Sequence, residues 1–429
     1  MTQKANAKNE SLKKILIVGG GFSGLNAAKI LGNVGNIDVV LVDKNNHHLF
    51  QPLLYQVATA GLSSSDIAIP IRSILAGYSN IRVFQGNVNS VDLSLRVAST
   101  NFGKLEYDYL ILACGARHTY FGHNEWEKFA PGLKTLEQAT EIRRRILTAF
   151  EKAERILDPH EQKKLLTFVV VGGGPTGVEL AGAIGEMSRY TLVKDFKNIN
   201  PALTRVILIE AGPRILPSFS EKQAARAVRD LEALGVQVWA SSTVSNVDEN
   251  GVDMGIEKIQ AATVLWAAGV QGIDLNRKLG TELDKQGRMI VEPDLSIKEY
   301  REVFIGGDQA CFLDQTGKPL PGLAPVAIQQ GKFIAKNILR EINGESRLKF
   351  QYQDKGQLAT IGKNRAIADT GKFKLEGFAA WIAWLFIHIL FIIGFNNRLL
   401  VFIKWVTSYV SNRKGARLIT NIKWRFYDH

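Results

Sequence analysis

The stretch "KKILIVGGGFSGLNAAKIL" (13–31) decides the fold class of this chain. It has a run rich in Ile, Leu and Val, then a GGGxxG loop, then a helix-forming stretch with small side chains. The same plan recurs in "LTFVVVGGGPTGVELAGAI" (166–184), and the first glycines of the two loops, Gly19 and Gly172, lie 153 residues apart. We therefore expect two copies of one strand–turn–helix module rather than a short-period repeat.

Each copy is followed by a second apolar run that ends in an acid. "IDVVLVDK" (37–44) ends with Asp43, and "LTRVILIEAG" (203–212) contains Glu210. Strands that alternate with helical stretches predict parallel sheets covered by helices. The expected fold class is α/β, with two Rossmann-like domains and a C-terminal amphipathic helical segment. A charged amphipathic helix is expected at 137–157.

The glycine spacing has a mechanical meaning in dinucleotide binding. The first glycine makes a tight turn, the second admits a pyrophosphate, and the third lets the helix pack on the strand. The pyrophosphate then lies at the helix N-terminus, whose free N–H groups favour anions. The two triplets are Gly19, Gly21, Gly24 and Gly172, Gly174, Gly177. Glycines that serve only helix–strand packing are the alternative, but this alternative does not predict the downstream acids.

Asp43 and Glu210 are placed to accept hydrogen bonds from ribose hydroxyls. Glu210 would repel a 2′-phosphate, which favours NADH over NADPH, although the nearby Arg214 keeps NADPH as an alternative. Asp43 follows Gly24 at the usual spacing. Glu210 follows its loop late, so an insertion is expected around 188–203.

Length and charge limit the number of domains and the kind of partner. The chain has 429 residues, which predicts two or three domains, and a net charge of +12. Half of this charge lies in residues 396–429, beside an apolar run. This arrangement favours anionic lipid over nucleic acid as the partner. The alternative is a basic tail that is only solvated. These basic residues are Arg398, Lys404, Arg413, Lys414, Arg417, Lys423 and Arg425, opposed by Asp428.

The two cysteines and the N-terminus give further expectations. Cys114 and Cys311 form no CxxC pair and no Cys/His metal spacing, so a reducing compartment and no metal site are expected. The first residues are polar and lack the apolar core of a signal peptide.

The apolar segment Phe378–Phe395 has 18 residues with one polar side chain, His388. As a helix it would be about 27 Å long, close to a bilayer core of roughly 30 Å. The next stretch, 398–411, places Lys404, Thr407, Ser408 and Ser411 on one stripe, as in an interfacial helix. A span would carry the basic tail away from the side of the NADH site, against the positive-inside bias. A monotopic arrangement is therefore expected, with His388 packed on the catalytic body; a buried core helix is the alternative.

Three further motifs connect the modules: "YLILACGA" (109–116), "VLWAAGV" (264–270) and "FIGGDQA" (304–310). Together with the glycine loops, in this order, they resemble the two-dinucleotide-binding-domain flavoproteins. The resemblance implies a tightly held FAD and an exchangeable NADH, with Asp308 on FAD. It implies an FAD domain at 1–136 and 285–344, an NADH domain at 137–284, and a C-terminal membrane-association region at 345–429.

Three local stretches sharpen the resemblance: 45–75, 320–338 and the C-terminal 378–409. They resemble the type II NADH:quinone oxidoreductases, which are single-subunit and do not pump protons. This family has a quinone pattern A-Q-x-A-x-Q-x-G, which here begins at Ala324 and ends at Gly331, with Pro325 in place of the first Gln. The resemblance implies a quinone substrate, catalytic roles for Glu179, Gln329 and Lys404, and a homodimer. It also implies a respiratory, monotopic enzyme on the cytoplasmic face of the inner membrane.

The resemblance also implies the residues that bind the cofactors. For FAD these are Gly19, Gly21, Phe22, Ser23, Gly24, Asp43, Lys44, Gln51, Val88, Ala113, Gly115, Asp308, Ala327 and Ile328. For NADH they are Gly172, Gly174, Pro175, Thr176, Gly177, Glu210, Ala268 and Gly269.

Other acceptors of electrons are weighed against quinone. A disulfide reductase needs a CxxxxC pair and a peroxide reductase needs a cysteine in 40–65, and the sequence has neither. Sulfide:quinone oxidoreductases need flanking cysteines and often have a degraded second loop, whereas the second loop here is intact. A soluble NADH-dependent flavoprotein reductase or a redox sensor stays open. His47 and His48 are interpreted as capping a loop rather than donating protons.

Overall fold

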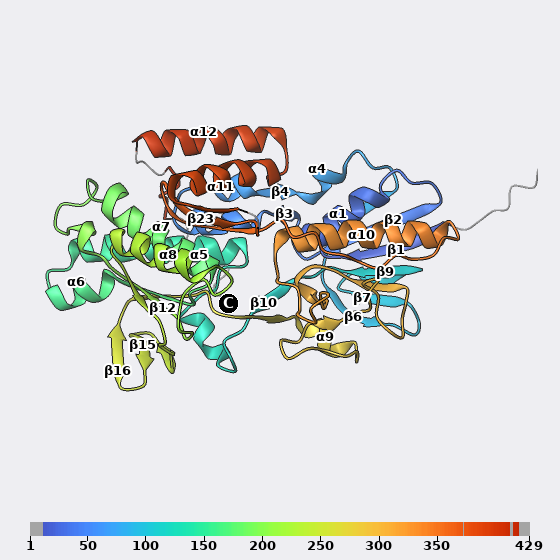
Figure 1. Cartoon of the computed structure of the whole chain (residues 1–429), viewed down its shortest axis with the longest axis horizontal. Coiled ribbons are helices and arrows are strands. Elements are labelled where there is room, and N and C mark those ends of the chain that lie inside the picture. The colour runs from blue at the N-terminus through green and yellow to red at the C-terminus, as the bar shows by residue number, and fades with distance from the viewer. Residues whose placement is uncertain (1–11, 372, 412–414, 420–429) are drawn as a thin grey trace, which may run out of the picture. The chain divides into compact units, whose positions relative to one another are not determined.

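The computed structural model describes residues 12–371, 373–411 and 415–419. The chain divides into two compact units, which are described separately (Figure 1). Unit 1 consists of Met1–His48, Ile69–Arg117 and Val270–Gln353, and unit 2 of Leu49–Ala68, His118–Gly269 and Asp354–His429.

Unit 1 is built on a five-stranded parallel sheet in the order β20-β9-β1-β2-β5. The strands are β1 (Lys13–Val18), β2 (Ile37–Asp43), β5 (Ile81–Gln85), β9 (Tyr109–Leu112) and β20 (Val303–Ile305). Helix α1 (Phe22–Leu31) packs beside α10 (Ala324–Ile342). A Cβ on Gly331 would lie 2.0 Å from the carbonyl oxygen of Ser23, so glycine permits this close approach. The predicted first module is confirmed.

Unit 1 also carries smaller elements around this sheet. These are the antiparallel strands β6 (Val88–Asp92), β7 (Val97–Thr100) and β8 (Gly103–Glu106), the parallel pair β19 (Met289–Ile290) and β21 (Ala310–Cys311), and helices α4 (Ile71–Leu75) and α9 (Asp274–Lys278). Short strands at the unit boundaries are β3 (His47–Leu49), β4 (Ala68–Pro70), β10 (Ala116–His118) and β18 (Val270–Gly272).

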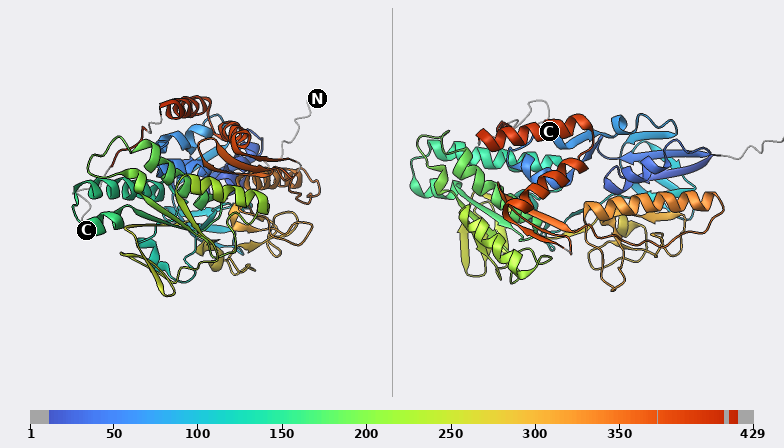
Figure 2. Two further views of the ribbon diagram at one scale, coloured as in Figure 1. Left: turned by 60° about the vertical axis from the view of Figure 1, so that its left-hand side comes forward. Right: turned by 45° about the horizontal axis from the view of Figure 1, so that its top comes forward.

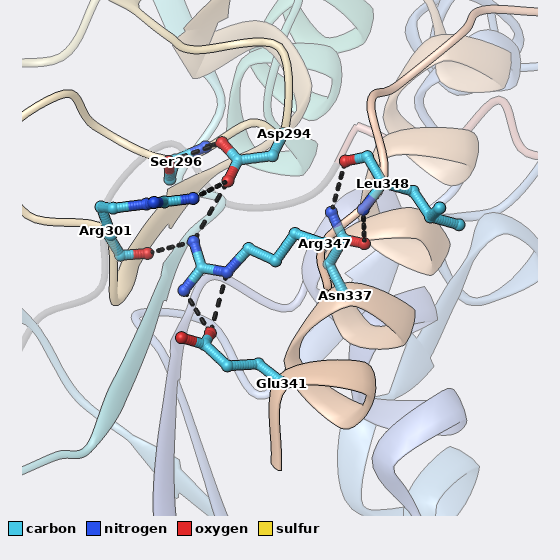
Figure 3. A network of polar contacts seen from close by, with 7 residues as sticks. All are labelled: Asp294, Ser296, Arg301, Asn337, Glu341, Arg347 and Leu348. Carbon is cyan, nitrogen blue, oxygen red and sulfur yellow. Dashed lines mark hydrogen bonds and ion pairs between the residues drawn. The ribbon is translucent and has the colours of Figure 1, made fainter. Parts of the chain in front are cut away.

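Arg347 fastens the chain that leaves α10 (Figure 3). Its buried guanidinium pairs with Glu341, lies 3.2 Å from Asp294 Oδ2 and donates to the carbonyl of Arg301 at 2.7 Å. The same group lies 4.7 Å from the ring centroid of Phe304 in β20. Since a buried charge needs such partners, this network holds the segment after α10 against the strand that leads into the "GGD" turn.

Unit 2 repeats the plan with a four-stranded parallel sheet in the order β13-β12-β11-β17. The strands are β11 (Thr167–Val171), β12 (Arg205–Ile209), β13 (Val236–Trp239) and β17 (Thr263–Trp266). The helices are α5 (Leu136–Arg155), α6 (Pro159–Leu165), α7 (Pro175–Glu186) and α8 (Glu221–Ala233). The second module and the helix expected at 137–157 are confirmed, and Thr135 caps α5 by accepting from the backbone of Gln138.

The predicted insertion lies between α7 and β12. It begins with a π-helix at Met187–Thr191 and ends with a 3-10 turn at Pro201–Leu203. The carboxylate of Glu154 accepts from the backbone N–H groups of Lys197, Asn198 and Ile199, which fixes the insertion on α5. A separate antiparallel sheet contains β14 (Asn246–Asp248), β15 (Gly251–Met254) and β16 (Glu257–Gln260).

The region 345–376 reads as mixed and polar in the sequence, yet most of it forms a three-stranded antiparallel sheet. Its strands are β22 (Gln357–Gly362), β23 (Arg365–Asp369) and β24 (Lys374–Glu376). Helix α11 (Gly377–Phe391) packs on this sheet and buries Ala380 and Trp381 against Ala366 and Ala368. Strands β22 and β23 each bury three consecutive residues, so neither strand shows the alternation that marks a half-buried strand.

The expected 18-residue apolar helix is wrong in length. Helix α11 has 15 residues, about 22 Å, because Ile392 is extended and Gly394 has φ of +85°. Helix α12 (Phe395–Ser411) follows and lies against α11 (Figure 2). Among the described residues, no helix is both long and apolar enough to cross a bilayer. The remaining short helices of unit 2 are α2 (Leu54–Ala58) and α3 (Ser64–Ile67).

Candidate functional site

In the glycine triplet of unit 1, only the second member, Gly21, has open space beside it. Gly19 has φ of +105°, and a Cβ there would lie 2.3 Å from the carbonyl oxygen of Ala113. A Cβ on Gly24 would lie 1.9 Å from the carbonyl oxygen of Gly19. A Cβ on Gly21 would meet no atom within 4 Å. The first and third glycines therefore serve the turn and the packing, while the second leaves space at the start of α1.

Polar groups around this loop fit an anionic dinucleotide. Asp43 Oδ2 accepts from Gly20 N at 2.6 Å, and Oδ1 accepts from Asn45 N at 2.7 Å, so the carboxylate braces the loop. Burial raises the pKa of Asp43. Within the described chain, the Ser23 hydroxyl in the first turn of α1 is buried without a hydrogen-bond partner. A buried hydroxyl of this kind calls for a ligand or water, and a pyrophosphate at this helix start would supply one.

Two buried glutamines that the sequence analysis did not select hold the third FAD motif. Gln330 Oε1 accepts from Gly307 N at 2.8 Å, in the short helix η5 (Gly307–Gln309) that carries Asp308. Gln309 Oε1 accepts from Cys114 N at 2.8 Å, and its amide donates to Asn276 at 2.7 Å. These bonds tie the "GGD" turn to the "ACG" turn. Both glutamines are polar residues within motifs of small residues, and this contrast is the sequence signal that could have indicated their role.

The other residues assigned to FAD are distributed as follows. Phe22, Ala113, Gly115, Ala327 and Ile328 lie in unit 1, in α1, in the turn after β9, and in α10. Lys44 is exposed after β2, and Val88 begins β6. Gln51 belongs to unit 2.

Unit 2 builds its glycine loop in the same way. Gly172 has φ of +112°, and a Cβ on Gly177 would lie 1.8 Å from the Gly172 carbonyl oxygen, while one on Gly174 would meet nothing within 4 Å. Glu210 accepts from Gly173 N and from Gly212 N, each at 2.6 Å. Pro175 and Thr176 begin α7, and Ala268 and Gly269 follow β17. A dinucleotide fits this loop as it fits the first.

Arg214 is occupied by main-chain carbonyls. Its guanidinium donates to the carbonyl oxygens of Phe219 at 2.8 Å and Pro217 at 2.9 Å. It thus braces its own loop, while Glu210 presents its carboxylate at the glycine turn. This arrangement supports NADH over NADPH.

Unit 2 contains a cavity of about 50 Å³, partly open to solvent, beside α7. Four segments line it: α2, the face of α7, the end of β22 with its turn, and α12. The lining residues are Tyr55, Gln56, Thr59, Gly61, Glu179, Ala183, Glu186, Thr360, Gly362, Lys363, Trp405 and Ser408. We call it the Glu179 pocket.

Burial in this pocket raises the pKa of Glu179 to about 8. Thr360 N lies 3.5 Å from Glu179 Oε1, a long contact that opposes the shift only weakly. The raised pKa favours the protonated form of this carboxyl group at neutral pH. A neutral acid in such a pocket can give a proton to a bound oxygen and take one back.

Helix α12 forms its wall of the pocket through buried polar contacts. Trp405 Nε1 donates to Gln56 Oε1 at 2.7 Å, and the Gln56 amide donates to the Tyr55 hydroxyl at 3.0 Å. Lys404 Nζ lies 2.6 Å and 2.7 Å from the two carboxylate oxygens of Asp66. Lys404 is thus next to the pocket wall and anchors α12 on α3.

The sequence predicted that the polar stripe of α12 lies at lipid head groups. This prediction is wrong for two residues of the stripe. Lys404 faces Asp66, and Ser408 lines the pocket, because α12 buries this side of the helix and exposes its apolar side. Ser411 has no described side chain, and Arg413, Lys414, Lys423 and Arg425 lie outside the described residues. Arg417 pairs with Asp195 of the insertion.

Gln329 lies in unit 1, and its amide is engaged at both ends. Its Nε2 donates to the Gln353 carbonyl at 2.9 Å, and its Oε1 accepts from Gln353 N at 3.0 Å. The residue pins the chain that leaves unit 1 to α10. The sequence pattern does not predict this pairing of the Gln329 side chain with the main chain.

Histidines and cysteines take structural positions. His388 Nδ1 donates to the Trp384 carbonyl at 2.8 Å, and its ring packs edge-on against Phe50, as expected for packing on the body of the protein. His48 Nδ1 donates to the Gly20 carbonyl at 2.9 Å. Burial lowers the pKa of both histidines to about 4. Burial raises the pKa of the Cys114 thiol to about 12, so this thiol is not a ready nucleophile.

Comparisons with known proteins agree with this architecture. The model of the pyridine nucleotide-disulphide oxidoreductase family matches residues 13–331, and the model of the NDH2 C-terminal domain matches 355–414. The type II NADH:quinone oxidoreductase Ndh of Mycobacterium tuberculosis is 42% identical over 435 residues, covering 98% of this chain and 93% of that protein.

Two solved structures share the fold. NDH2 from Plasmodium falciparum, in complex with NADH, has a TM-score of 0.87 at 21% identity, covering 96% of this chain and 100% of that one. The sulfide:quinone oxidoreductase from Aquifex aeolicus has a TM-score of 0.70 at 18% identity, covering 88% and 90%. At these identities the likeness concerns the fold alone.

Proposed function

Because the chain belongs to the type II NADH:quinone oxidoreductases, it passes electrons from NADH through FAD to a quinone, and we propose that the Glu179 pocket serves the quinone step. The observation that carries this proposal is a carboxyl group, Glu179, that lines a cavity partly open to solvent, where burial raises its pKa. Reduction of a quinone to a quinol consumes two protons, and we propose that Glu179 supplies one.

The residues of the chain divide the work. The chemistry that FAD supplies when bound is to accept a hydride from NADH and to pass the electron pair on. We propose that Gly19, Gly21, Gly24, Asp43, Ser23 and Asp308 bind FAD, together with the other FAD residues named above. Gly172, Gly174, Gly177 and Glu210 orient NADH, together with the other NADH residues named above. Positioning of the two reacting rings is the main contribution of such a protein to the rate.

For the quinone step we propose different tasks for the three residues implied by the family resemblance. Glu179 holds and donates the proton. Lys404 positions the α12 wall through Asp66, and Gln329 positions the chain that leaves α10. The proposed domains are 1–136 with 285–344 for FAD, 137–284 for NADH and 345–429 for membrane association.

We propose peripheral membrane association through the outer sides of α11 and α12. Large apolar side chains there are exposed to solvent, which in a soluble protein marks an interaction surface. They are Phe378, Ile382, Phe386, Leu390 and Phe391 on α11, and Leu399, Leu400, Phe402, Ile403 and Val406 on α12. The same helices bury Trp384, Val401 and Trp405 against the protein. A quinone dissolved in lipid would then meet the wall of the Glu179 pocket.

The family resemblance alone supports three further parts of the proposal: a homodimer, a location on the cytoplasmic face of the inner membrane, and the absence of proton pumping.

Anaerobic flavin spectroscopy tests the function directly. NADH is expected to bleach the flavin of the holoenzyme within the mixing time, and menaquinone or ubiquinone analogues are expected to restore the oxidised spectrum. NADPH serves as the control for Glu210. Bleaching by sulfide but not by NADH would establish the sulfide:quinone alternative. Reduction by NADH without turnover on any quinone would instead establish the redox sensor.

A further inference from the structure

A second carboxylate, Glu186, lies on the same face of α7 as Glu179. The two residues are seven positions apart, which is about two helical turns or 10.5 Å along the axis. Between them, Gly182 packs directly on β22, since a Cβ there would lie 1.9 Å from the Ile361 carbonyl oxygen. This contact clamps the helix face to the strand and leaves one carboxyl group on each side of the contact.

Each carboxyl group faces one main-chain N–H of the end of β22. Glu179 Oε1 lies 3.5 Å from Thr360 N, and Glu186 Oε2 accepts from Lys363 N at 2.8 Å. Both side chains line the same cavity. The cavity volume of about 50 Å³ is enough for a few waters, since one water needs roughly 10–15 Å³ of such space. The two carboxyl groups therefore border one cavity that can hold water and is partly open to solvent.

A quinone site in this pocket needs a new supply of protons for every turnover. Quinone takes two electrons and two protons to become quinol, and Glu179 becomes a carboxylate when it gives one of those protons. The next turnover begins only after Glu179 has been reprotonated. Glu179 lines the cavity together with Tyr55, Thr360 and Trp405, and the cavity is partly open to solvent, so it offers a route for the proton.

We propose that Glu186 is the entry carboxyl group that passes protons from bulk water, through water in the pocket, to Glu179. Glu186 binds a proton from hydronium or a buffer acid, releases it to pocket water, and returns to the carboxylate, while Glu179 gains one proton. Electrons do not move in this step, and charge is conserved at each transfer. The inference rests on the proposed quinone role of the pocket.

The pocket is also lined by groups other than the two acids. The titratable side chains that line it besides the two acids are Tyr55 of α2 and Lys363 of the turn after β22. Tyr55 is 7% exposed and its hydroxyl accepts from the Gln56 amide. Helix α12 contributes Trp405 and Ser408, which do not titrate in the range that matters.

The structural alternative is that Glu186 only caps the turn after β22, where Asn364 has φ of +63°. Glu186→Gln separates the two roles, because the amide oxygen still accepts from Lys363 N while the exchangeable carboxyl proton is lost. Glu232→Gln is the matched control, since Glu232 is exposed on the neighbouring helix α8 and does not line the pocket.

The test compares two acceptors in the FAD-loaded enzyme: a water-soluble quinone, which consumes protons, and ferricyanide, which does not. In Glu186→Gln we expect kcat with quinone to fall at least about tenfold, with ferricyanide turnover unchanged. The solvent deuterium isotope effect on quinone turnover should rise, and small weak acids such as imidazolium should restore the rate. Glu232→Gln should match the wild-type enzyme.

Three results would overturn the proposal: a wild-type quinone rate in Glu186→Gln, an equal loss with both acceptors, or a loss that weak acids do not repair. If Glu186→Gln does not fold, Glu186→Asp carries the test. It keeps the acid but withdraws it by one methylene, so a raised isotope effect supports the relay and a wild-type isotope effect overturns it. Failure of the wild-type enzyme to reduce any quinone would overturn the proposed function instead, which keeps the two failures distinct.

Discussion

Lys404 on α12 grips both carboxylate oxygens of Asp66 on α3, at 2.6 Å and 2.7 Å, across 338 positions of sequence. Asp66 is 5% exposed and also accepts from Ser63 N at 2.7 Å, so it caps α3 and receives α12 at once. This ion pair between two helices far apart in sequence couples the α12 wall of the Glu179 pocket to the body of unit 2.

Lys404→Met should loosen this wall. Asp66 loses its charged partner, at a cost of about 1–3 kcal/mol in the free energy of unfolding. We expect a lower Tm and a higher KM for quinone, while KM for NADH stays unchanged. Lys404→Arg keeps the charge and should lie close to wild type. A quinone KM that is unaffected in Lys404→Met would separate α12 from the quinone site.

Glu179 should set the pH dependence of quinone reduction. Its folded pKa of about 8 lies above the usual carboxyl value, so the proton is present below that pH and is lost as the pH rises through about 8. Quinone turnover of the wild-type enzyme should fall over this range. Glu179→Gln should be slower by about 10²–10⁴ and lack this limb, with ferricyanide turnover kept. An unchanged alkaline limb in Glu179→Gln would refute the assignment.

The same group should affect stability with a definite sign. Because its pKa is raised in the folded state, its contribution is full below the unfolded pKa and is lost as the pH rises through about 8. The Tm of the wild-type enzyme should therefore fall more between pH 5 and pH 9 than that of Glu179→Gln.

Glu210 should decide between NADH and NADPH. A like charge near a 2′-phosphate costs about 1–4 kcal/mol at partly exposed distances, so Glu210→Gln should raise kcat/KM for NADPH relative to NADH by about tenfold or more. Arg214→Ala should leave this ratio unchanged, because its guanidinium is bound to main-chain carbonyls. A ratio that follows Arg214 and not Glu210 would contradict the interpretation.

The outer side of α11 and α12 should hold the protein on lipid. Phe386 is 68% exposed and Phe402 is 50% exposed, and burial of one such side chain is worth about 1.5–3 kcal/mol. Phe386→Ser and Phe402→Ser should each weaken binding to anionic vesicles in a flotation assay by about tenfold or more, with ferricyanide turnover intact. Leu157→Ser is the control, since Leu157 is 94% exposed elsewhere. Equal losses in all three variants would argue against this face.

His388 should contribute to acid sensitivity. Its folded pKa of about 4 is below the usual value near 6.5, so its contribution to stability is present above pH 6.5 and is lost as the pH falls towards 4. His388→Phe keeps an aromatic ring beside Trp384 but cannot be protonated. Its Tm should fall less than that of the wild type between pH 7 and pH 5, as measured by thermal denaturation. The same fall in both proteins would place the acid sensitivity elsewhere.

The two modules were predictable because their signals are local. The strand before Gly19, the loop and the helix after it are adjacent in sequence, and the same holds at Gly172, so buried β-branched runs and glycine spacing suffice. The acids Asp43 and Glu210 follow from the same geometry, since parallel strands end at one edge. The sheet β22–β24 was missed because its strands are short, and because β22 and β23 bury consecutive residues without the alternation that marks a half-buried strand.

The Glu179 pocket depends on contacts that no local pattern encodes. Sequence periodicity by itself determined the α/β class, both dinucleotide loops and the amphipathic character of α12, because each is a property of neighbouring residues. Only the tertiary structure decided which side of α12 turns inward, where α11 ends, and that Glu179, Glu186, Gln56 and Trp405 share one cavity. The reason is that burial, and with it the raised pKa of Glu179, is produced by four segments that are distant in sequence and meet only when the chain folds.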